Sequence, residues 1–318
     1  MRILIAGGAG FIGSNFVKLI LKSNYIDSIT IMDNLTYAGN LKNLTDEELN
    51  AVTFVKEDIC NFDKIVRYFR NIDVVVNFAA ESHVDRSITN SDPFIQTNIV
   101  GTHSLLSASI KNDIKKYIQV STDEVYGTIS EGSWDENFNL RPNSPYSASK
   151  ASADLLVQSF SKTHGLNTTI TRCSNNYGPQ QHIEKLIPKT ITNFLSGIKV
   201  PIYGNGLNVR EWIHVSDHCR AIECIMLNET NDDVYNIGSK EEISNIELIT
   251  KILKMLGGNN ESIEYVEDRK GHDQRYSLND TKFRNEFKLN NLFDLESGLQ
   301  NTINWYQENR SWWTNATK

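Results

Sequence analysis

A glycine-rich turn directly after the first apolar run constrains the fold of this chain more than any other feature. Residues 2–6 are mostly branched and apolar, and residues 7–13 read GGAGFIG before an amphipathic segment begins. In a strand–turn–helix unit, such glycines permit a tight turn, close approach of a pyrophosphate and close packing of the helix on the sheet. A plain turn between a strand and a helix is the alternative interpretation. Asp33 decides between them, because an acidic residue about 20 positions beyond the turn is typical of a dinucleotide site.

Asp33 also indicates which dinucleotide is bound. It stands at the end of the second apolar run, where a carboxylate accepts a hydrogen bond from a ribose 2′-hydroxyl and would repel a 2′-phosphate. The sequence therefore favours NAD over NADP. Asp58 closes the third run and is expected to border the adenine, with an exposed loop residue as the alternative.

Short apolar runs alternate with helical segments through the first half of the chain. The runs are rich in Ile and Val without regular polar alternation, as expected for strands that are buried on both faces of a parallel sheet. Segments 13–23 and 92–111 fit crossover helices. We therefore expect an α/β fold with a doubly wound parallel sheet of the Rossmann type. Its predicted strands cover residues 2–6, 28–32, 53–56, 73–78, 117–121 and 168–172.

The pattern changes after residue 176. Turn sequences occur at 177–179 and 204–206, and the helical segments 184–196 and 245–256 follow in a looser order. We expect residues 1–175 to form the cofactor domain and residues 176–318 to form a smaller α/β substrate domain, partly interleaved with the first.

Composition excludes several other classes of protein. The net charge of −7 disfavours a nucleic-acid-binding surface, and no apolar run has the roughly 18 residues of a membrane helix. The four cysteines have no CxxC spacing and the histidines no metal-ligand spacing. These features predict reduced thiols in a cytoplasmic protein, and no metal site.

Tyr146 and Lys150 form a candidate catalytic pair. They follow Ser144 and Pro145, a good N-cap and a good first helical residue, so they share one face near the start of a helix. An ammonium at roughly 4 to 6 Å with an effective dielectric of about 20 contributes about 3 to 4 kcal/mol. We therefore expect Lys150 to lower the pKa of Tyr146 and make it a base. An incidental YxxxK on a helix surface is the alternative.

Thr122, Asp123 and Glu124 follow the predicted strand 117–121, at the sheet edge where ligands bind. A hydroxyl alone suffices to hold a reacting oxygen. Elimination of water also needs one group to remove a carbon-bound proton and another to protonate the departing hydroxyl. The adjacent carboxyls of Asp123 and Glu124 could supply both the base and the acid. The alternative is that they are ordinary loop residues without a catalytic role.

In this order, the motifs resemble the extended short-chain dehydrogenase/reductase family and, within it, the nucleotide-sugar 4,6-dehydratases, particularly those acting on dTDP-glucose. This sequence departs from the usual pattern of the family at three places. Ala6 precedes the first glycine where many members have Thr, Lys270 replaces a proline, and residues 181–183 replace an aromatic-proline pair. The matching stretches are residues 33–40, 79–87, 97–102, 172–179, 184–188 and 210–218.

The resemblance implies a hydro-lyase that uses NAD catalytically and converts dTDP-glucose to dTDP-4-dehydro-6-deoxy-glucose, in rhamnose-type deoxysugar and surface polysaccharide biosynthesis. Tyr146 would take the C4 hydroxyl proton while Thr122 steadies the oxygen. Glu124 would then remove the C5 proton, and Asp123 would protonate the C6 hydroxyl as it leaves. A UDP-sugar 4-epimerase, a dehydratase for UDP-glucose and a catalytically silent NAD sensor remain as alternatives.

The resemblance also implies the binding residues and a homodimer formed through segments 92–111 and 146–163. The cofactor residues would be Gly7, Gly10, Phe11, Ile12, Gly13, Asp33, Asn34, Leu35, Thr36, Asp58, Ile59, Ala79, Ala80, Glu81, Ser82, Thr97, Tyr146, Lys150 and Asn176. The nucleotide-sugar residues would be Ser82, Thr122, Asn175, Lys185, Leu186, Pro201, Ile202, Tyr203, Arg210, Asn245, Arg269 and His272.

Overall fold

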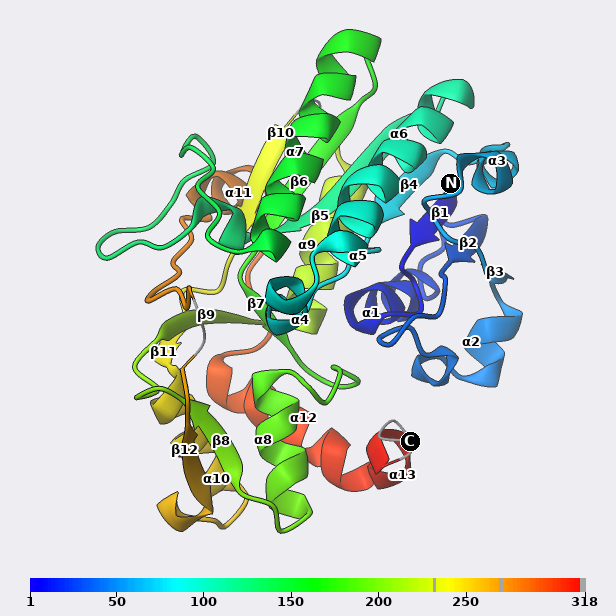
Figure 1. Ribbon diagram of the computed structural model, residues 1–318. Helices are drawn as coiled ribbons and strands as arrows, with labels where there is room; N and C mark the ends of the chain where they lie inside the picture. Colours follow the sequence, from blue (N-terminus) through cyan, green and yellow to red (C-terminus); the bar gives the residue numbers. More distant parts are fainter. Residues whose placement is uncertain (231–232, 269–270, 315–318) are drawn as a thin grey trace.

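A seven-stranded parallel sheet forms the centre of the computed structural model, which describes residues 1–230, 233–268 and 271–314 (Figure 1). Its strand order is β10-β6-β5-β4-β1-β2-β3. The order reverses between β1 and β4, and ligands bind at such a switch point beyond the carboxyl ends of the strands. The strands are β1 (Arg2–Ala6), β2 (Ser28–Met32), β3 (Thr53–Val55), β4 (Val74–Asn77), β5 (Lys116–Thr122), β6 (Thr168–Cys173) and β10 (Asp233–Ile237).

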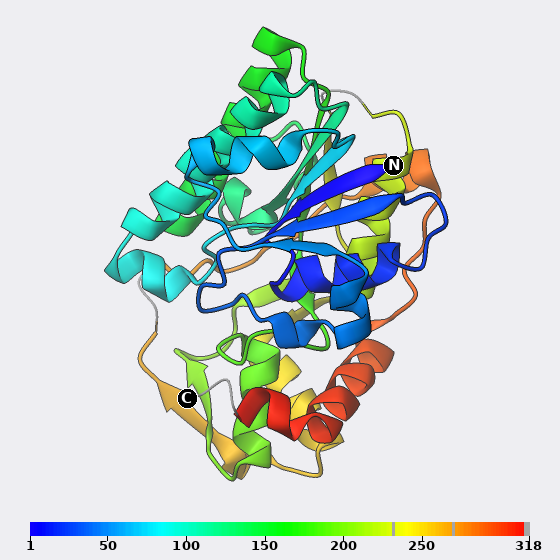
Figure 2. The same cartoon turned by 90° about the vertical axis from the view of Figure 1, so that its right-hand side faces the viewer.

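Helices cover both faces of this sheet, as Figure 2 shows. Ile3 and Ile5 pack in one core cluster with α1 (Phe11–Ile20) and α9 (Val215–Leu227). Leu4 packs in the opposite cluster with α6 (Thr102–Lys111) and α7 (Pro145–His164). Side chains alternate between the two faces of a strand, so a strand covered on both sides must be apolar throughout. The predicted Rossmann-type fold class is confirmed.

The predicted helix 92–111 forms with an irregular centre. It consists of α5 (Asp92–Phe94), the π-helical segment η3 (Ile95–Gly101) and α6. A Cβ atom on Gly101 would lie 2.5 Å from Cδ1 of Ile59, so the segment packs closely on the loop after β3. The other short helices are η1 (Leu41–Asn43), α2 (Asp46–Asn50), α3 (Phe62–Ile65), η2 (Val66–Phe69), α4 (Val84–Thr89), η4 (Asp123–Tyr126), η5 (Asn260–Ser262), α11 (Thr281–Phe287) and α13 (Arg310–Thr314).

The chain after residue 176 contributes to two regions of the molecule. Both α9 and β10 lie on the large sheet, so the halves interleave. Most of the remainder surrounds a separate apolar core with α8 (Leu186–Leu195), α10 (Asn245–Met255) and α12 (Leu295–Glu308). Its small sheets have the orders β11-β9-β7 and β12-β8. Their strands are β7 (Asn175–Tyr177), β8 (Val200–Tyr203), β9 (Val209–His214), β11 (Glu242–Ser244) and β12 (Ile263–Val266).

In the described parts of the chain, we find no helix with both the length and the apolar character required to cross a membrane.

Candidate active site

The glycine turn forms a compact cradle at the start of α1. Gly7 has a φ of +76°, and a Cβ atom on it would lie 2.5 Å from the backbone nitrogen of Ala79. A Cβ atom on Gly13 would lie 2.3 Å from the carbonyl oxygen of Gly7. Gly10 is the N-cap, and Ser14 N–H donates to its carbonyl oxygen at 2.9 Å. The N–H groups in the first turn of α1, before Ser14, therefore remain available for an anion, which fits a dinucleotide pyrophosphate.

Asp33 lies beside this cradle at the end of β2. Its carboxylate accepts hydrogen bonds from the N–H groups of Ala9 at 3.0 Å and Leu35 at 2.8 Å. Burial raises its pKa. Each carboxylate oxygen can accept a second bond, as a ribose hydroxyl would require. Asn34 Nδ2 donates to Asp58 Oδ2 at 3.2 Å, so the ends of β2 and β3 are joined as an adenosine site would require.

Asn98 connects the end of β4 to α7, which carries Tyr146 and Lys150, and the sequence reasoning missed this role. Glu81 N–H donates to Asn98 Oδ1 at 2.9 Å, and Asn98 Nδ2 donates to Ser149 Oγ at 2.8 Å. The asparagine lies in η3 and inside the matching stretch 97–102, which was the available signal. Nearby, Lys185 Nζ donates to the carbonyl oxygen of Ser82 at 2.8 Å, which brings two predicted substrate residues together.

The start of α7 positions Tyr146 and Lys150. Ser144 and Ser147 form a capping box with Pro145 at the first helical position, so the helix begins where the sequence predicts. Both catalytic candidates are buried, and Lys150 Nζ donates to the carbonyl oxygen of Val120 at 2.7 Å. The i and i+4 pair thus faces the carboxyl end of β5.

The expected lowering of the Tyr146 pKa is wrong for the protein alone. Burial raises that pKa well above its ordinary value, and the negative charge of Glu124 acts in the same direction, while a hydrogen bond with Thr122 opposes both. Burial also lowers the pKa of Lys150. A buried phenol is easier to keep neutral than to ionise, so desolvation outweighs the attraction on which the prediction relied.

The acidic pair lies directly after β5. Thr122 Oγ1 donates to Asp123 Oδ1 at 3.1 Å, and Glu124 N–H donates to Thr122 Oγ1 at 3.2 Å. Asp123 is 1% exposed, and its Oδ2 has no hydrogen-bond partner among the residues that the structure describes. Burial, together with the charges of Glu124 and Glu211, raises the pKa of Asp123 well above its ordinary value. The raised pKa favours the protonated form of Asp123, which a general acid requires.

Glu211 is a buried carboxylate in β9 that the sequence reasoning did not single out. Its Oε1 accepts hydrogen bonds from the N–H groups of Ser239 at 2.7 Å and Lys240 at 2.9 Å. Its Oε2 accepts one from Leu278 N–H at 2.8 Å. Burial raises the pKa of Glu211, and the three backbone donors oppose this rise. The charge of the ionised Glu211 carboxylate raises the pKa of Asp123. Its position in the matching stretch 210–218 was the only sequence signal.

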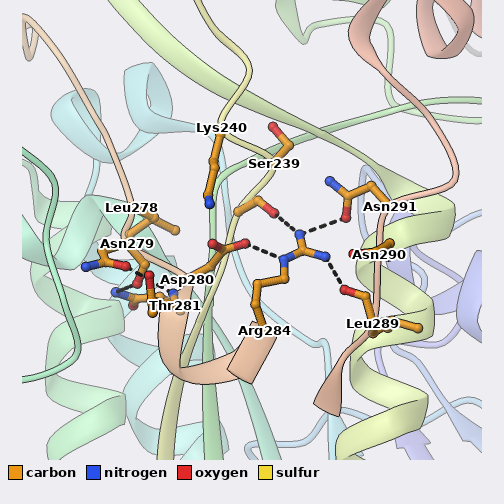
Figure 3. Close-up of polar contacts among 12 residues, drawn as sticks. Ser239, Lys240, Leu278, Asn279, Asp280, Thr281, Arg284, Leu289, Asn290 and Asn291 are labelled. Carbon is orange, nitrogen blue, oxygen red and sulfur yellow. Dashed lines mark hydrogen bonds and ion pairs between the residues drawn. The ribbon is translucent and has the colours of Figure 1, made fainter. Parts of the chain in front are cut away.

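Arg284 holds together the loops that supply these N–H groups (Figure 3). It forms an ion pair with Asp280 at 2.7 Å and donates to the carbonyl oxygen of Gly238 and to Asn291 Oδ1, each at 2.8 Å. A Cβ atom on Gly238 would lie 2.2 Å from Glu211 Oε1. A glycine at this position therefore lets the loop close over the carboxylate.

Arg210 and Tyr276 pack against each other near Asp123 and Glu124. The Arg210 guanidinium lies 4.2 Å from the centre of the Tyr276 ring and donates to the carbonyl oxygen of Asp273 at 2.9 Å. Burial raises the pKa of Tyr276, and the charge of Glu124 adds to this effect. Asn245 Oδ1 is buried with no hydrogen-bond partner in the described parts of the chain. An unsatisfied acceptor of this kind suits a bound ligand.

The other candidates are distributed around these groups, except that Arg269 lies outside the described residues. His272 Nδ1 pairs with Asp268 Oδ1 at 2.7 Å, and Asn176 Oδ1 with His218 Nδ1 at 2.8 Å. Within the described residues, no group of three His, Cys, Asp or Glu side chains is placed to hold a metal. The remaining positions are Thr36 after β2, Ile59 after β3, Ala80 after β4, Thr97 in η3, Asn175 in β7, Leu186 in α8, and Pro201, Ile202 and Tyr203 in β8.

Comparisons with known proteins agree with this geometry. A family model described as GDP-mannose 4,6 dehydratase matches residues 4–309. A dTDP-glucose 4,6-dehydratase of Streptomyces niveus is 47% identical, with 98% of this chain and 95% of the relative covered. The structure of a dTDP-glucose 4,6-dehydratase from Streptomyces venezuelae, solved with NAD bound, superposes with a TM-score of 0.97 at 46% identity, covering 99% and 100% of the two chains.

A UDP-glucose 4-epimerase from Thermotoga maritima has the same overall fold. It superposes with a TM-score of 0.90 at 30% identity, and 97% of this chain and 99% of the epimerase are covered. The architecture alone therefore does not separate epimerases from dehydratases, whereas sequence identity favours the dehydratases. The chain belongs to the family of nucleotide-sugar dehydratases described as GDP-mannose 4,6 dehydratase, in which its relatives include dTDP-glucose 4,6-dehydratases at 47% identity.

Proposed function

We propose that the protein converts dTDP-glucose to dTDP-4-dehydro-6-deoxy-glucose and water. The observation that carries this proposal is the buried Asp123, whose pKa is raised well above its ordinary value, beside Glu124 and close to Tyr146. An elimination needs an acid that keeps its proton and a separate base. The adjacent carboxyls differ in burial, since Asp123 is fully enclosed and Glu124 is half-buried.

The proposed reaction divides its proton transfers among three side chains. Tyr146 accepts the C4 hydroxyl proton, and Thr122 steadies the oxygen. NAD, when bound, would supply the hydride acceptor for C4 and the hydride donor for C6. The C4 ketone acidifies the neighbouring C5–H, whose proton Glu124 removes, and Asp123 protonates the C6 hydroxyl, which departs as water and leaves a C5–C6 double bond. When hydride adds to C6, Glu124 returns a proton to C5, and this proton can exchange with solvent. Lys150, fixed by the Val120 carbonyl, orients the site and adds positive charge near the phenol.

The substrate is proposed to lie between the large sheet and the β9 region. Arg210, whose guanidinium lies 4.2 Å from the centre of the Tyr276 ring, and Lys185 are suited to the diphosphate, because guanidinium and ammonium groups bind phosphate oxygens. Asn245 has an unsatisfied oxygen for a ligand donor. The remaining cofactor and substrate residues predicted from the sequence keep their proposed roles, and the choice of dTDP over UDP rests on the relatives.

A UDP-sugar 4-epimerase is the second candidate, favoured only by the shared fold. Such an enzyme would share NAD, Tyr146 and Lys150, but would have no use for an acid and a base that remove water. A silent NAD sensor would need neither the tyrosine–lysine pair nor the two carboxyls. The enclosed Asp123 beside Glu124 therefore favours the dehydratase.

We further propose a cytoplasmic homodimer. Four large apolar side chains, Ile88, Ile95, Val100 and Leu155, are exposed on α4, η3 and α7, and both α4 and η3 pack against α7. Exposed apolar surface shared by neighbouring helices is typical of an interface. The cytoplasmic location is proposed because the four cysteines are free thiols.

Incubation with dTDP-glucose in deuterated water tests the proposed reaction. We expect a product that has lost one water and carries deuterium at C5, with no net release of NADH. A product of unchanged mass would overturn the dehydratase assignment. UDP-glucose in a parallel reaction tests the choice of base, and a Tyr146→Phe variant that retains NAD but turns over normally would remove Tyr146 from the mechanism.

A further inference from the structure

Asn43 connects the glycine turn to the C-terminal end of the described chain. Its side chain is almost completely buried, and Nδ2 donates to the carbonyl oxygen of Ala9 at 2.9 Å. Its Oδ1 accepts a hydrogen bond from Nε1 of Trp312 at 3.1 Å. Figure 1 shows α13, which carries this tryptophan, beside the segment that leads into α2. One amide thus joins two parts of the chain that are 269 residues apart.

The peptide groups of Ala9 lie in the middle of the turn and form hydrogen bonds on both sides. Ala9 N–H donates to Asp33 Oδ2 at 3.0 Å, and the Ala9 carbonyl oxygen also accepts from Asn40 N–H at 3.0 Å. These contacts set the orientation of the peptide planes between Gly7 and Gly10. Asn43 is thus one of three groups that fix the shape of the cradle.

Trp312 is well placed to fix the orientation of Asn43. Its ring packs nearly edge-on against Trp305, with centroids 5.0 Å apart and an interplanar angle of 76°. The indole N–H therefore points at Asn43 from a packed aromatic cluster, and little side-chain entropy remains to be lost when the hydrogen bond forms. Gln180 Nε2 also donates to the backbone oxygen of Asn43 at 2.9 Å, so Asn43 is held from a second side.

We propose that Trp312 is a positioning residue for the dinucleotide cofactor, acting through Asn43 on the Ala9 carbonyl. Helix α13 then holds the turn in the shape that receives the pyrophosphate. We call this chain of hydrogen bonds from Trp312 through Asn43 to Ala9 the brace. This inference rests on the proposed NAD site. It assigns a role in cofactor affinity to a residue that touches neither the cofactor nor the sugar.

Trp312→Phe tests the brace, with Trp313→Phe as the matched control. Both variants keep an aromatic ring and lose one indole N–H, but Trp313 Nε1 donates to the carbonyl oxygen of Tyr306 at 2.9 Å instead of to Asn43. We expect Trp312→Phe to raise the Kd for NAD roughly fivefold, as loss of one net hydrogen bond implies. Trp313→Phe should leave the Kd within about twofold of wild type at a comparable loss of thermal stability.

Isothermal titration calorimetry with NAD gives the Kd, and the nucleotide retained by washed protein gives a second readout. With NAD saturating, kcat of Trp312→Phe should equal that of wild type. Asn43→Asp is a second variant, because it keeps an acceptor for the indole but loses the donor to Ala9, and it should weaken NAD binding similarly. In the double variant with Asn43→Asp, Trp312→Phe should add little.

Three outcomes would overturn the brace. The first is a Kd for NAD in Trp312→Phe that equals that of a wild type able to bind NAD. The second is that Trp313→Phe weakens NAD binding as much as Trp312→Phe does. The third is additive effects of Trp312→Phe and Asn43→Asp. Failure of the wild type itself to bind NAD would overturn the proposed cofactor site and the brace with it, so the two failures are distinguishable.

Discussion

Replacing Asp123 by Asn should make the protein increasingly stable relative to wild type as the pH rises, while it removes the proposed acid. The carboxyl is 1% exposed, and burial is the main cause that raises its pKa well above 3.8. Above pH 3.8 the unfolded chain releases this proton, whereas the folded protein keeps it until the pH reaches the raised value. Between the two pKa values, the free energy of unfolding therefore falls by about 1.4 kcal/mol for each pH unit. Asn has a similar shape and no proton to lose, so Asp123→Asn should escape this loss.

Urea unfolding of wild type and Asp123→Asn at several pH values between 4 and 8 measures the difference. The cost of burying the new amide is independent of pH, so it shifts the comparison without changing its slope. We expect the stability of the variant relative to wild type to rise with pH at about 1.4 kcal/mol per unit, until the folded protein also ionises. Parallel stability curves across this range would refute the reasoning that Asp123 is held neutral by burial.

The same variant should fail at one defined step of the reaction. Loss of a general acid costs roughly 10²- to 10⁴-fold in rate, and the C4 oxidation uses Tyr146 and Thr122 instead. Reduced cofactor should therefore accumulate in a single turnover, followed by absorbance, while loss of water measured by mass spectrometry is slow. Glu124→Gln is the control, because it should also block elimination yet retain the part of the stability loss that comes from burial of Asp123, which is the main cause of its raised pKa. A dehydration rate within threefold of wild type would refute the assignment of Asp123 as the acid.

Three further variants test the site and the assembly. Glu211→Gln removes a charge that raises the pKa of Asp123, so the alkaline limb of the pH profile for dehydration should move to lower pH, and an unchanged profile would contradict that role. Gly13→Ala places a Cβ atom 2.3 Å from a backbone oxygen of the turn, and calorimetry should show an NAD Kd raised at least about tenfold; a Kd close to wild type would mean that the cradle can relax. Leu155→Glu puts a charge on the proposed dimer surface and should give a monomer in light scattering, whereas Leu207→Glu, exposed on another part of the molecule, should not.

Local patterns allowed the cofactor half to be predicted closely. The glycine turn, the Asp33 position and the Ser144 cap each depend on residues near one another in the chain, and the structure places all three as expected. The β1 and β2 bounds agree with the predicted runs, because strands buried on both faces leave a continuous apolar signal. The π-helical η3 was not predicted, since a single extra backbone residue per turn leaves no distinct periodicity over seven residues.

Long-range electrostatics could not be predicted in the same way. The sequence suggested that Lys150 would lower the pKa of Tyr146, but the tertiary structure buries the phenol near Glu124, and desolvation reverses the direction. Glu211 carried no local signal, because its three hydrogen-bond donors come from segments that only the fold brings to β9.

The sequence by itself determined the chemical groups of this protein and the order in which the chain presents them. It identified the dinucleotide turn, the YxxxK pair and the adjacent carboxyls, because each is a short motif whose geometry follows from one strand end or one helix. Only the tertiary structure decided which carboxyl is enclosed and has a raised pKa, and which distant side chains contact the turn. Burial and charge proximity depend on residues from separate parts of the chain, so no local pattern could have specified them.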